Sequence, residues 1–394
     1  MSKSNETTPN VPTLRFAEFA EQWEQKTFDE TFLILSNNTL SRAELNYENG
    51  NYKNIHYGDV LIKFSTFIDV SSPDVPYIND ENSSSKLDNI LLQDGDIIIA
   101  DTAEDFTVGK ATEVENIDGI KVVSGLHTIP CRPIIKFSPR YIGYYVNSPA
   151  YHNQLIPFIQ GVKVSSISKT LIKKTFVSFP SLSEQTKIAD FLSCLDKKIE
   201  TQNKIISKYE TLIKGLSCYI IKKFNGKAYK LGTLAEIYQP QTITKTDLPD
   251  NGKYPVYGAN GIIGFFDRFN HKESQIMITC RGSTCGTVNL STPYSWITGN
   301  SMVINIDKHT SMVDKKYLYY YLKIQSFSDL ISGSGQPQIV RKPLVNLNVF
   351  LPEISQQIKL RKIIDTFEKT LKNEKEMLSA LQKQKAFLLQ SMFI

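Results

Sequence analysis

The fold is decided by the stretch SLSEQTKIADFLSCLDKKIETQNKIISKYETLIKGL (residues 181–216), which recurs 172 positions later as EISQQIKLRKIIDTFEKTLKNEKEMLSALQKQKAFL (residues 353–388). The same shift carries Gly161 to Gly333 and Gln185 to Gln357 without a gap. A repeat of this length indicates a chain built from two copies of one structural unit.

Apolar residues recur in both stretches in alternating steps of four and three, which is the heptad pattern of a coiled coil. The seam comprises Ile188, Leu192, Leu195, Ile199, Gln202 and Ile206 in the first copy, and Leu360, Ile364, Phe367, Leu371, Glu374 and Leu378 in the second. The pattern predicts two long helices, each about 60 Å long at 1.5 Å per residue, that pack against each other. It does not fix their direction. Gln202 and Glu374 interrupt the seam, either as tolerated polar residues or as a hydrogen bond that fixes register.

Each predicted helix is preceded by a proline and a serine three residues later, Pro180 with Ser183 and Pro352 with Ser355. A serine at the start of a helix accepts a hydrogen bond from a free backbone N–H of the first turn. We therefore expect Ser183 and Ser355 to cap the two helices.

Before each helix lies a head with short β-type runs followed by aromatic helical sequence. Ile97–Ala100 and Ile276–Thr279 read as equivalent buried strands, and Tyr141–Tyr145 and Tyr317–Tyr321 as equivalent helices. The predicted fold class is α+β, with two duplicated mixed α/β domains that are each followed by a long helix. The expected divisions are 1–182 (with about 1–22 as an N-terminal extension), 183–224, 225–354 and 355–394.

Composition bounds the function. A chain of 394 residues with 41% hydrophobic residues can form two ordinary domains, and a net charge of +5 only mildly favours an anionic partner. Five cysteines at irregular spacing do not form a disulfide framework. The polar N-terminus and the lack of a run of about 20 apolar residues predict a cytoplasmic protein with no membrane segment.

Motifs for catalysis are missing from the sequence. The pair Gly109-Lys110 has Glu104 and Ala111 where a phosphate-binding loop needs glycine and a hydroxyl residue. The five histidines show no metal-ligand spacing, and a nuclease site at Asp250, Asp314 and Lys316 would rest on a chance combination. We therefore expect a non-catalytic chain without a cofactor or metal of its own.

The duplicated plan resembles the specificity subunits of type I restriction-modification systems over nearly the full length. The resemblance is carried by six segments: Pro12–Phe16, Tyr229–Gly232, Tyr257–Gly261, Gly333–Ile339, and the helix entries Phe179–Gln185 and Leu351–Gln357. Each segment is weak alone, but their order and repetition are specific. The first head departs from the pattern, because Lys26-Thr27-Phe28 stands where the second head has Lys230-Leu231-Gly232.

The resemblance implies a function in DNA recognition. Each head would be a target recognition domain for one half of a bipartite site in double-stranded DNA. The two helices would pack antiparallel, set the gap between the half-sites and dock two methyltransferase (modification) subunits. Restriction subunits, which translocate and cleave DNA, would join this core, and S-adenosylmethionine, ATP and magnesium would be bound by these partners.

Candidate DNA-binding residues lie in polar, glycine-containing loops of the heads. Arginine recognises guanine and Asn or Gln recognises adenine through paired hydrogen bonds, whereas lysine and serine suit phosphates. The candidates are Asn260, Arg281, Ser283 and Asn300 in the second head, and Lys110, His127 and Lys163 in the first. Gln336 and Gln338 occupy positions shared with Val164 and Ser166, so we expect them to pack the head onto its helix.

Two other functions remain open on the residues alone. One is a duplicated adaptor or scaffold that binds proteins or glycans rather than DNA. The other is a self-sufficient nuclease, which the missing motifs disfavour. The adaptor would retain no specific DNA even with methyltransferase subunits present, and the nuclease would turn over DNA by itself.

Overall fold

The computed structural model describes residues 10–79, 85–161, 164–223, 226–333 and 335–394, and these residues form two compact units. Unit 1 contains residues up to 201 together with 378–394, and unit 2 contains residues 202–377. Each long helix therefore contributes one part to each unit. No helix in the described ranges is both long and apolar enough to span a membrane.

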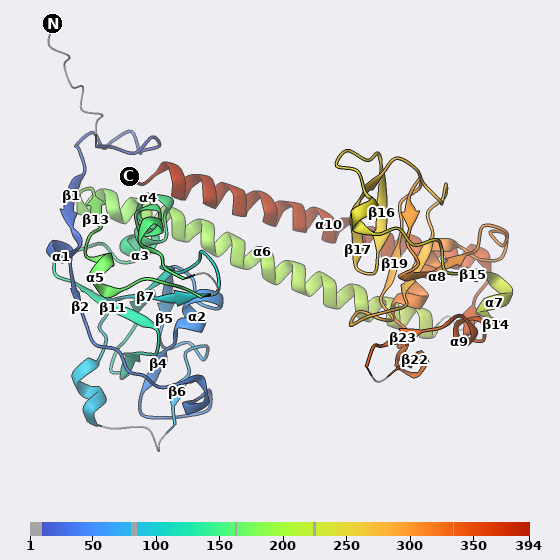
Figure 1. Cartoon of the computed structure of the whole chain (residues 1–394), viewed down its shortest axis with the longest axis horizontal. Helices are drawn as coiled ribbons and strands as arrows, with labels where there is room; N and C mark the ends of the chain where they lie inside the picture. The colour runs from blue at the N-terminus through green and yellow to red at the C-terminus, as the bar shows by residue number, and fades with distance from the viewer. Residues whose placement is uncertain (1–9, 80–84, 162–163, 224–225, 334) are drawn as a thin grey trace, which may run out of the picture. The chain divides into compact units, whose positions relative to one another are not determined.

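Unit 1 contains two main sheets (Figure 1). The larger has the order β2 (Phe32–Ile34), β11 (Thr128–Pro133), β7 (Ile97–Ala100), β9 (Ala111–Glu115) and β5 (Phe67–Asp69). The other has the order β10 (Val122–Ser124), β4 (Lys53–Ile55), β6 (Tyr77–Ile78) and β3 (Leu45–Asn46). The predicted strand at residues 97–100 is confirmed as β7, which is buried along its length and pairs antiparallel with β11 and β9.

The remaining elements of unit 1 connect these sheets to the first long helix. They are β1 (Glu24–Thr27), α1 (Phe28–Thr31), α2 (Tyr57–Ile62), β8 (Thr102–Ala103), α3 (Tyr141–Val146), α4 (Pro149–Leu155), β12 (Ser165–Ser166), α5 (Lys169–Ile172), β13 (Phe176–Phe179) and α6 (Leu182–Lys223). Every residue of α3 is buried, because its side chains lie between the large sheet and the first half of α6. The predicted aromatic helix is therefore the centre of the unit 1 core.

Unit 2 repeats this arrangement in a smaller form. Its sheets have the orders β15 (Glu236–Tyr238), β21 (Ser301–Asn305), β18 (Ile276–Thr279), β19 (Val288–Leu290), and β17 (Gly261–Phe266), β16 (Tyr254–Gly258), β20 (Trp296–Ile297). The connecting elements are β14 (Lys227–Lys230), α7 (Leu231–Leu234), α8 (Lys315–Lys323), β22 (Ile331–Ser332), β23 (Gln338–Ile339), α9 (Arg341–Val345), β24 (Asn348–Leu351) and α10 (Ile354–Ser391). The predicted strand at 276–279 and helix at 317–321 are confirmed as β18 and part of α8.

The two heads open in the same way despite their different sequences. β1 pairs antiparallel with β13, with Glu24 opposite Phe179, and β14 pairs antiparallel with β24, with Lys227 opposite Leu351. Phe179 and Leu351 are related by the 172-residue shift of the repeat. By this register Lys26-Thr27-Phe28 is the structural counterpart of Tyr229-Lys230-Leu231, one residue earlier in the second head than the sequence had suggested.

The two long helices, α6 and α10, pack antiparallel in each unit. In unit 1, Ile188 and Leu192 near the start of α6 share a core with Leu388 and Met392 at the end of α10. In unit 2, Gln202 bonds to Glu374, whereas Ile213, farther along α6, shares a core with Leu360, near the start of α10. Seam side chains thus contact the heads as well as the opposite helix. In a free coiled coil, by contrast, they contact only the partner helix.

The polar interruption of the seam is a direct contact within unit 2. The side-chain amide of Gln202 donates to both the backbone carbonyl of Glu374, at 3.0 Å, and its carboxylate. Gln202 is buried, with 8% of its surface exposed. Of the two interpretations of Gln202 and Glu374, this geometry favours the hydrogen bond that fixes register.

Both long helices begin one residue before the expected serines, at Leu182 and Ile354. The expectation that Ser183 and Ser355 cap them is therefore wrong. The first helical bonds run from Gln185 N–H to the Ser181 carbonyl and from Gln357 N–H to the Glu353 carbonyl, both at 3.0 Å. These bonds place each serine inside the first turn.

A buried glutamine attaches each head to the start of its helix. Gln185 donates to the carbonyl of Pro180 at 2.9 Å and accepts from the backbone N–H of Ser138 at 3.0 Å. Its counterpart Gln357 donates to the carbonyl of Pro352 at 2.8 Å and to that of Met312 at 3.0 Å. These two residues, which the repeat preserves, join helix and head in the way that the sequence had suggested for Gln336 and Gln338.

The N-terminal extension is part of unit 1. The backbone N–H of Leu14 donates to the carbonyl of Ser391 at 2.9 Å, and Arg15 forms a bidentate ion pair with Glu184, with both contacts at 2.7 Å. Glu184 is 1% exposed. Residues 10–23 therefore bind the start of α6 and the end of α10 together within this unit.

Glu113 on β9 makes the stability of unit 1 depend on pH. Burial raises the pKa of Glu113 to about 7 from its ordinary 4.5, although its carboxylate accepts N–H bonds from Gly143 and Arg140. The folded state therefore holds a proton that the unfolded state releases. This contribution to stability is complete below pH 4.5 and is lost as the pH rises through 7, by up to about 3 kcal/mol.

We expect Glu113→Gln to flatten this pH dependence, because the amide stays neutral. The measurement is urea unfolding between pH 5 and 8, followed by fluorescence of Trp23 in unit 1 with Trp296 of unit 2 replaced by phenylalanine. Glu104→Gln, at an exposed position of the same unit, is the control and should keep the slope. An unchanged slope in Glu113→Gln would show that another group is responsible.

Candidate nucleic-acid interface

In unit 2, the loop that follows β18 lies between two other loops. The backbone N–H of Cys280 donates to the carbonyl of Asn300 at 3.0 Å, and the N–H of Ile339 donates to the carbonyl of Cys280 at 3.0 Å. Arg281, the next residue, forms an antiparallel bridge with Gln338. Three segments that are far apart in sequence thus meet around Arg281.

The hairpin between β16 and β17 joins this cluster. The hydroxyl of Thr279 donates to the carbonyl of Ala259 at 2.5 Å, and the hydroxyl of Thr284 donates to the side-chain oxygen of Asn260. These contacts place Asn260 against the turn that contains Ser283. The structure therefore brings together four predicted residues of the second head, with exposed side chains: Asn260, Arg281, Ser283 and Asn300.

The Asn260 amide oxygen accepts from Thr284, whereas the side chains of Arg281, Asn300 and Gln338 are exposed to solvent. Within the described part of the chain, the Arg281 guanidinium forms no ion pair with a carboxylate. Gly299 permits the close approach of the loops, because a Cβ there would lie 2.5 Å from the Thr242 hydroxyl and 2.9 Å from the Pro240 carbonyl. The cluster, which we call the unit 2 loop cluster, consists of Asn260, Arg281, Ser283, Asn300 and Gln338.

Unit 1 has the same backbone frame at the end of β7. The N–H of Asp101 donates to the carbonyl of His127 at 3.1 Å, and the N–H of Ile167 donates to the carbonyl of Asp101 at 2.9 Å. Ser166 lies opposite Thr102 in the antiparallel pair of β12 and β8. Thr102, His127 and Ser166 therefore correspond to Arg281, Asn300 and Gln338 of unit 2.

The side chains on this common frame differ in chemistry. The Thr102 hydroxyl donates to the Asp101 carboxylate at 2.8 Å, and the His127 Nδ1 lies 3.4 Å from the same carboxylate. The ring of His127 also meets that of Tyr57 edge to face at 5.2 Å. Unit 1 thus has an acid, an imidazole and hydroxyls where unit 2 has a guanidinium, two amides and a thiol.

The sequence matches the family described as "Type I restriction modification DNA specificity domain" twice, over residues 20–211 and 225–383. The chain belongs to this family. The two matches cover both heads and most of both long helices. The fold class expected from the sequence, two mixed α/β domains with antiparallel long helices, is confirmed by the structure and the family match.

Relatives in this specificity family resemble the chain to different extents. A putative type I restriction enzyme MjaX specificity subunit from Methanocaldococcus jannaschii is 22% identical over 95% of this chain and 94% of its own length. The type I restriction enzyme EcoprrI specificity subunit from Escherichia coli is 26% identical over 38% of this chain, and the match spans 37% of that protein. The second match is thus local, whereas the first spans the whole duplicated plan.

Solved structures show the same fold. The S subunit of a type I restriction-modification system from M. genitalium superposes with a TM-score of 0.60 at 17% identity and covers 98% of this chain and 99% of its own. A structure described as "Structural basis underlying complex assembly and conformational transition of the type I R-M system" superposes with a TM-score of 0.56 at 15% identity. At these identities the likeness concerns the fold.

The two remaining predicted DNA-binding residues are Lys110 and Lys163, both in the first head. The Lys110 ammonium donates to the carbonyl of Leu61 at 2.8 Å, and burial, followed by the charge of Lys385, lowers the pKa of Lys110. Lys110 is half-buried, and its ammonium is directed at its own domain. Its structural counterpart in unit 2 is Thr287. The carbonyl of Lys110 accepts the N–H of Ala100 at the end of β7, and the carbonyl of Thr287 accepts the N–H of Thr279 at the end of β18. Lys163 lies outside the described residues.

The expectation for Gln336 and Gln338 is wrong. Both side chains are exposed, and Gln338 lies opposite Arg281 instead of between the head and its helix. Gly333 has a φ of +93°, and a Cβ there would lie 2.6 Å from the Gln336 carbonyl, so glycine permits the turn that brings Gln338 to this place. Gly161 in unit 1 has a φ of +108° and the same relation to the Val164 carbonyl. One signal in the sequence could have shown that these glutamines do not share a packing role with the first copy. The equivalent residues there are Val164 and Ser166, which differ in chemistry from Gln336 and Gln338.

Proposed function

We propose that this chain is the DNA-recognition subunit of a type I restriction-modification complex. Each head would read one half of a bipartite target in double-stranded DNA, and the two long helices would set the gap and dock two methyltransferase subunits. Restriction subunits would join this assembly in the cytoplasm. The observation that carries the proposal is the repeated backbone frame in the two heads, which carries different side chains at equivalent positions.

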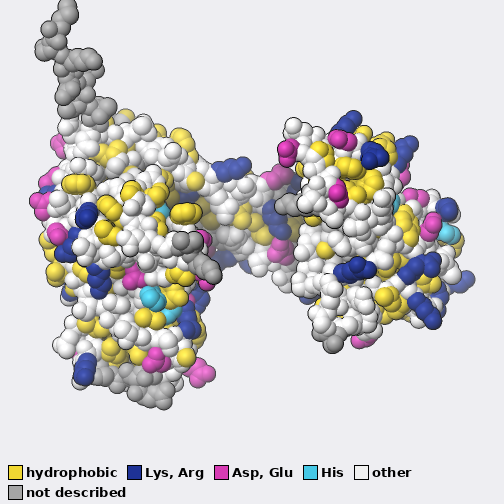
Figure 2. Space-filling view, in the orientation of Figure 1, with side chains coloured by type: hydrophobic (Ala, Val, Ile, Leu, Met, Phe, Trp, Pro, Cys, Tyr) yellow, Lys and Arg dark blue, Asp and Glu magenta, His cyan; other side chains and the backbone are white. Residues whose placement is uncertain are grey.

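Positive charge on unit 2 supports a DNA ligand. α9 begins three residues after Gln338, and Figure 2 shows Lys and Arg side chains gathered over the end of unit 2 that α9, α7 and β14 form. Exposed cations there are Lys227, Lys230, Arg341 and Lys342. Basic side chains in the same head as base-reading groups suit a duplex, because phosphate contacts give most of the affinity and base contacts give the sequence preference.

A non-catalytic role follows from this proposal. Methyl transfer, ATP hydrolysis and cleavage would belong to the partner subunits, which would bind S-adenosylmethionine, ATP and magnesium. The family match across both copies favours this reading over a DNA-independent adaptor or a self-sufficient nuclease.

The test is to co-express the chain with its modification subunit and to map N6-methyladenine across the host genome by single-molecule sequencing. We expect a single two-part motif with a fixed gap, which disappears when the chain is deleted. Exchange of residues 225–354 for those of another family member should change one half of the motif only. Methylation that is unaffected by the deletion would favour the adaptor and refute the proposal.

A further inference from the structure

We propose that Arg281 in unit 2 and Thr102 in unit 1 occupy the same base-reading position of the two heads, and that Arg281 selects a guanine there. This inference rests on the proposed function. It adds to that function the residue that determines one base in each half-site. It also gives the kind of base pair that the second head requires.

The argument begins with the backbone, which is fixed from both sides in each unit. The residue before the reading position donates to the loop carbonyl of His127 or Asn300 and accepts from Ile167 or Ile339, at distances of 2.9–3.1 Å. Thr102 is opposite Ser166, and Arg281 is opposite Gln338. Because the main chain is held alike, the two heads differ at this position mainly in the side chain that they present.

Arg281 has the properties of a guanine-reading residue. Its side chain is exposed, it forms no ion pair in the ranges that the structure covers, and the amides of Asn300 and Gln338 come from the residues that flank it. A guanidinium offers two parallel N–H donors that match O6 and N7 of guanine in the major groove. An exposed arginine just after β18, whose backbone two neighbouring segments hold in place, is preorganised for such a contact, because its backbone needs no reordering.

Thr102 cannot make that contact. Its hydroxyl is a single donor and is already bonded to the Asp101 carboxylate at 2.8 Å. Asp101 also faces His127, so the charged group that Thr102 contacts is an acceptor rather than a donor. A carboxylate accepts from the amino group of cytosine and repels phosphate. The first head therefore requires a different base at the equivalent place in its half-site.

A phosphate contact is the other role open to Arg281, and the two roles predict different results. Loss of a phosphate contact weakens binding to all sequences alike and reduces the salt dependence. Loss of a guanine contact removes discrimination at one base pair, by about 5- to 150-fold, and leaves the other positions intact. A lysine keeps the charge but not the paired donors, so Arg281→Lys separates the two roles.

The experiment uses the full chain in complex with its modification subunit. Oligonucleotides that carry the methylated motif, each with one base pair replaced, are compared in competition binding for wild type, Arg281→Gln, Arg281→Lys and Thr102→Arg. The control is Arg268→Gln, an exposed arginine of the same unit whose guanidinium lies over the Phe266 ring. Genomic methylation maps of the same variants give a second readout in cells.

We expect both Arg281 variants to bind the replaced and the original base pair equally at one G·C position of one half-site, with the gap and the other half unchanged. Thr102→Arg should alter preference at one position of the opposite half, and Arg268→Gln should leave all preferences as in wild type. A uniform loss of affinity in Arg281→Gln that Arg281→Lys restores would overturn the inference while leaving the bipartite function intact. Absence of any two-part motif in wild type would instead refute the proposed function.

Discussion

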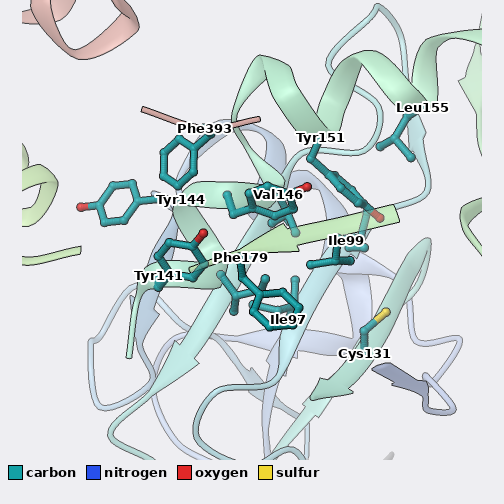
Figure 3. Close-up of a cluster of buried hydrophobic side chains, with 14 of the residues drawn as sticks. Ile97, Ile99, Cys131, Tyr141, Tyr144, Val146, Tyr151, Leu155, Phe179 and Phe393 are labelled. Carbon is teal, nitrogen blue, oxygen red and sulfur yellow. The ribbon is translucent and has the colours of Figure 1, made fainter. Parts of the chain in front are cut away.

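Replacing Phe393 with alanine is expected to lower the free energy of unfolding of unit 1 by about 3 to 5 kcal/mol. Phe393 is 4% exposed, and its ring lies 6.4 Å from that of Trp23 and 5.9 Å from those of Tyr141 and Tyr145. Figure 3 shows it in the core next to the residues of α3. The substitution leaves a cavity among rigid aromatic rings that cannot close around it.

The matched control for Phe393→Ala is Phe387→Ala on α10, where 59% of the side chain is exposed and where we expect a change within about 0.5 kcal/mol. Both are measured by urea unfolding with Trp23 fluorescence in the Trp296→Phe background. Equal effects of the two substitutions would mean that the end of the chain does not complete this core.

The second large effect is expected for Gln357→Leu, which should lower the free energy of unfolding of unit 2 by about 3 to 5 kcal/mol. The substitution leaves three backbone groups without partners: the N–H of Asp314, which donates to the Gln357 side chain at 2.9 Å, and the carbonyls of Met312 and Pro352. An unsatisfied buried polar group costs about 1 to 3 kcal/mol, and these groups are partly exposed. Leucine has a similar size, so packing alone would be nearly conserved.

Hydrogen exchange of the backbone amides of α8 and β21 gives the measurement for Gln357→Leu. The neighbour Gln356, half-buried and without a side-chain hydrogen bond to the described residues, provides the control substitution Gln356→Leu. Gln185→Leu in unit 1 removes two side-chain hydrogen bonds, whereas Gln357→Leu removes three. It should therefore lower the free energy of unfolding by less. Similar exchange rates for Gln357→Leu and Gln356→Leu would contradict the assigned role.

Features with a regular period could be predicted from the sequence. The heptad spacing from Ile188 to Ile206 and from Leu360 to Leu378 predicts the long helices because a helix repeats its environment every few residues. The strands at 97–100 and 276–279 were likewise predictable from short apolar runs. The proline-to-serine spacing did not locate the first helical residues, because both serines lie inside the first turn and the helices begin at Leu182 and Ile354.

The arrangement of the loops could not be predicted in the same way. Arg281 and Gln338 are 57 positions apart, and the bridge between them depends on the fold of the whole head. The fixed shift of 172 also fails there, because Thr102 and Arg281 differ by 179 and His127 and Asn300 by 173. Insertions between the strands move the numbering while the hydrogen bonds keep the equivalence, so only the backbone contacts identify the matching positions.

The composition of unit 1 from two separated segments has a consequence for synthesis on the ribosome. Residues 202–377 form unit 2 as one continuous stretch, whereas unit 1 needs residues 378–394 in addition to its first 201. Trp23 and Tyr141 therefore have no Phe393 to cover them until residues 378–394 have been translated. The domain that is made first is completed last, and its apolar surface is exposed to aggregation and to chaperones during the time in which the second domain can already fold.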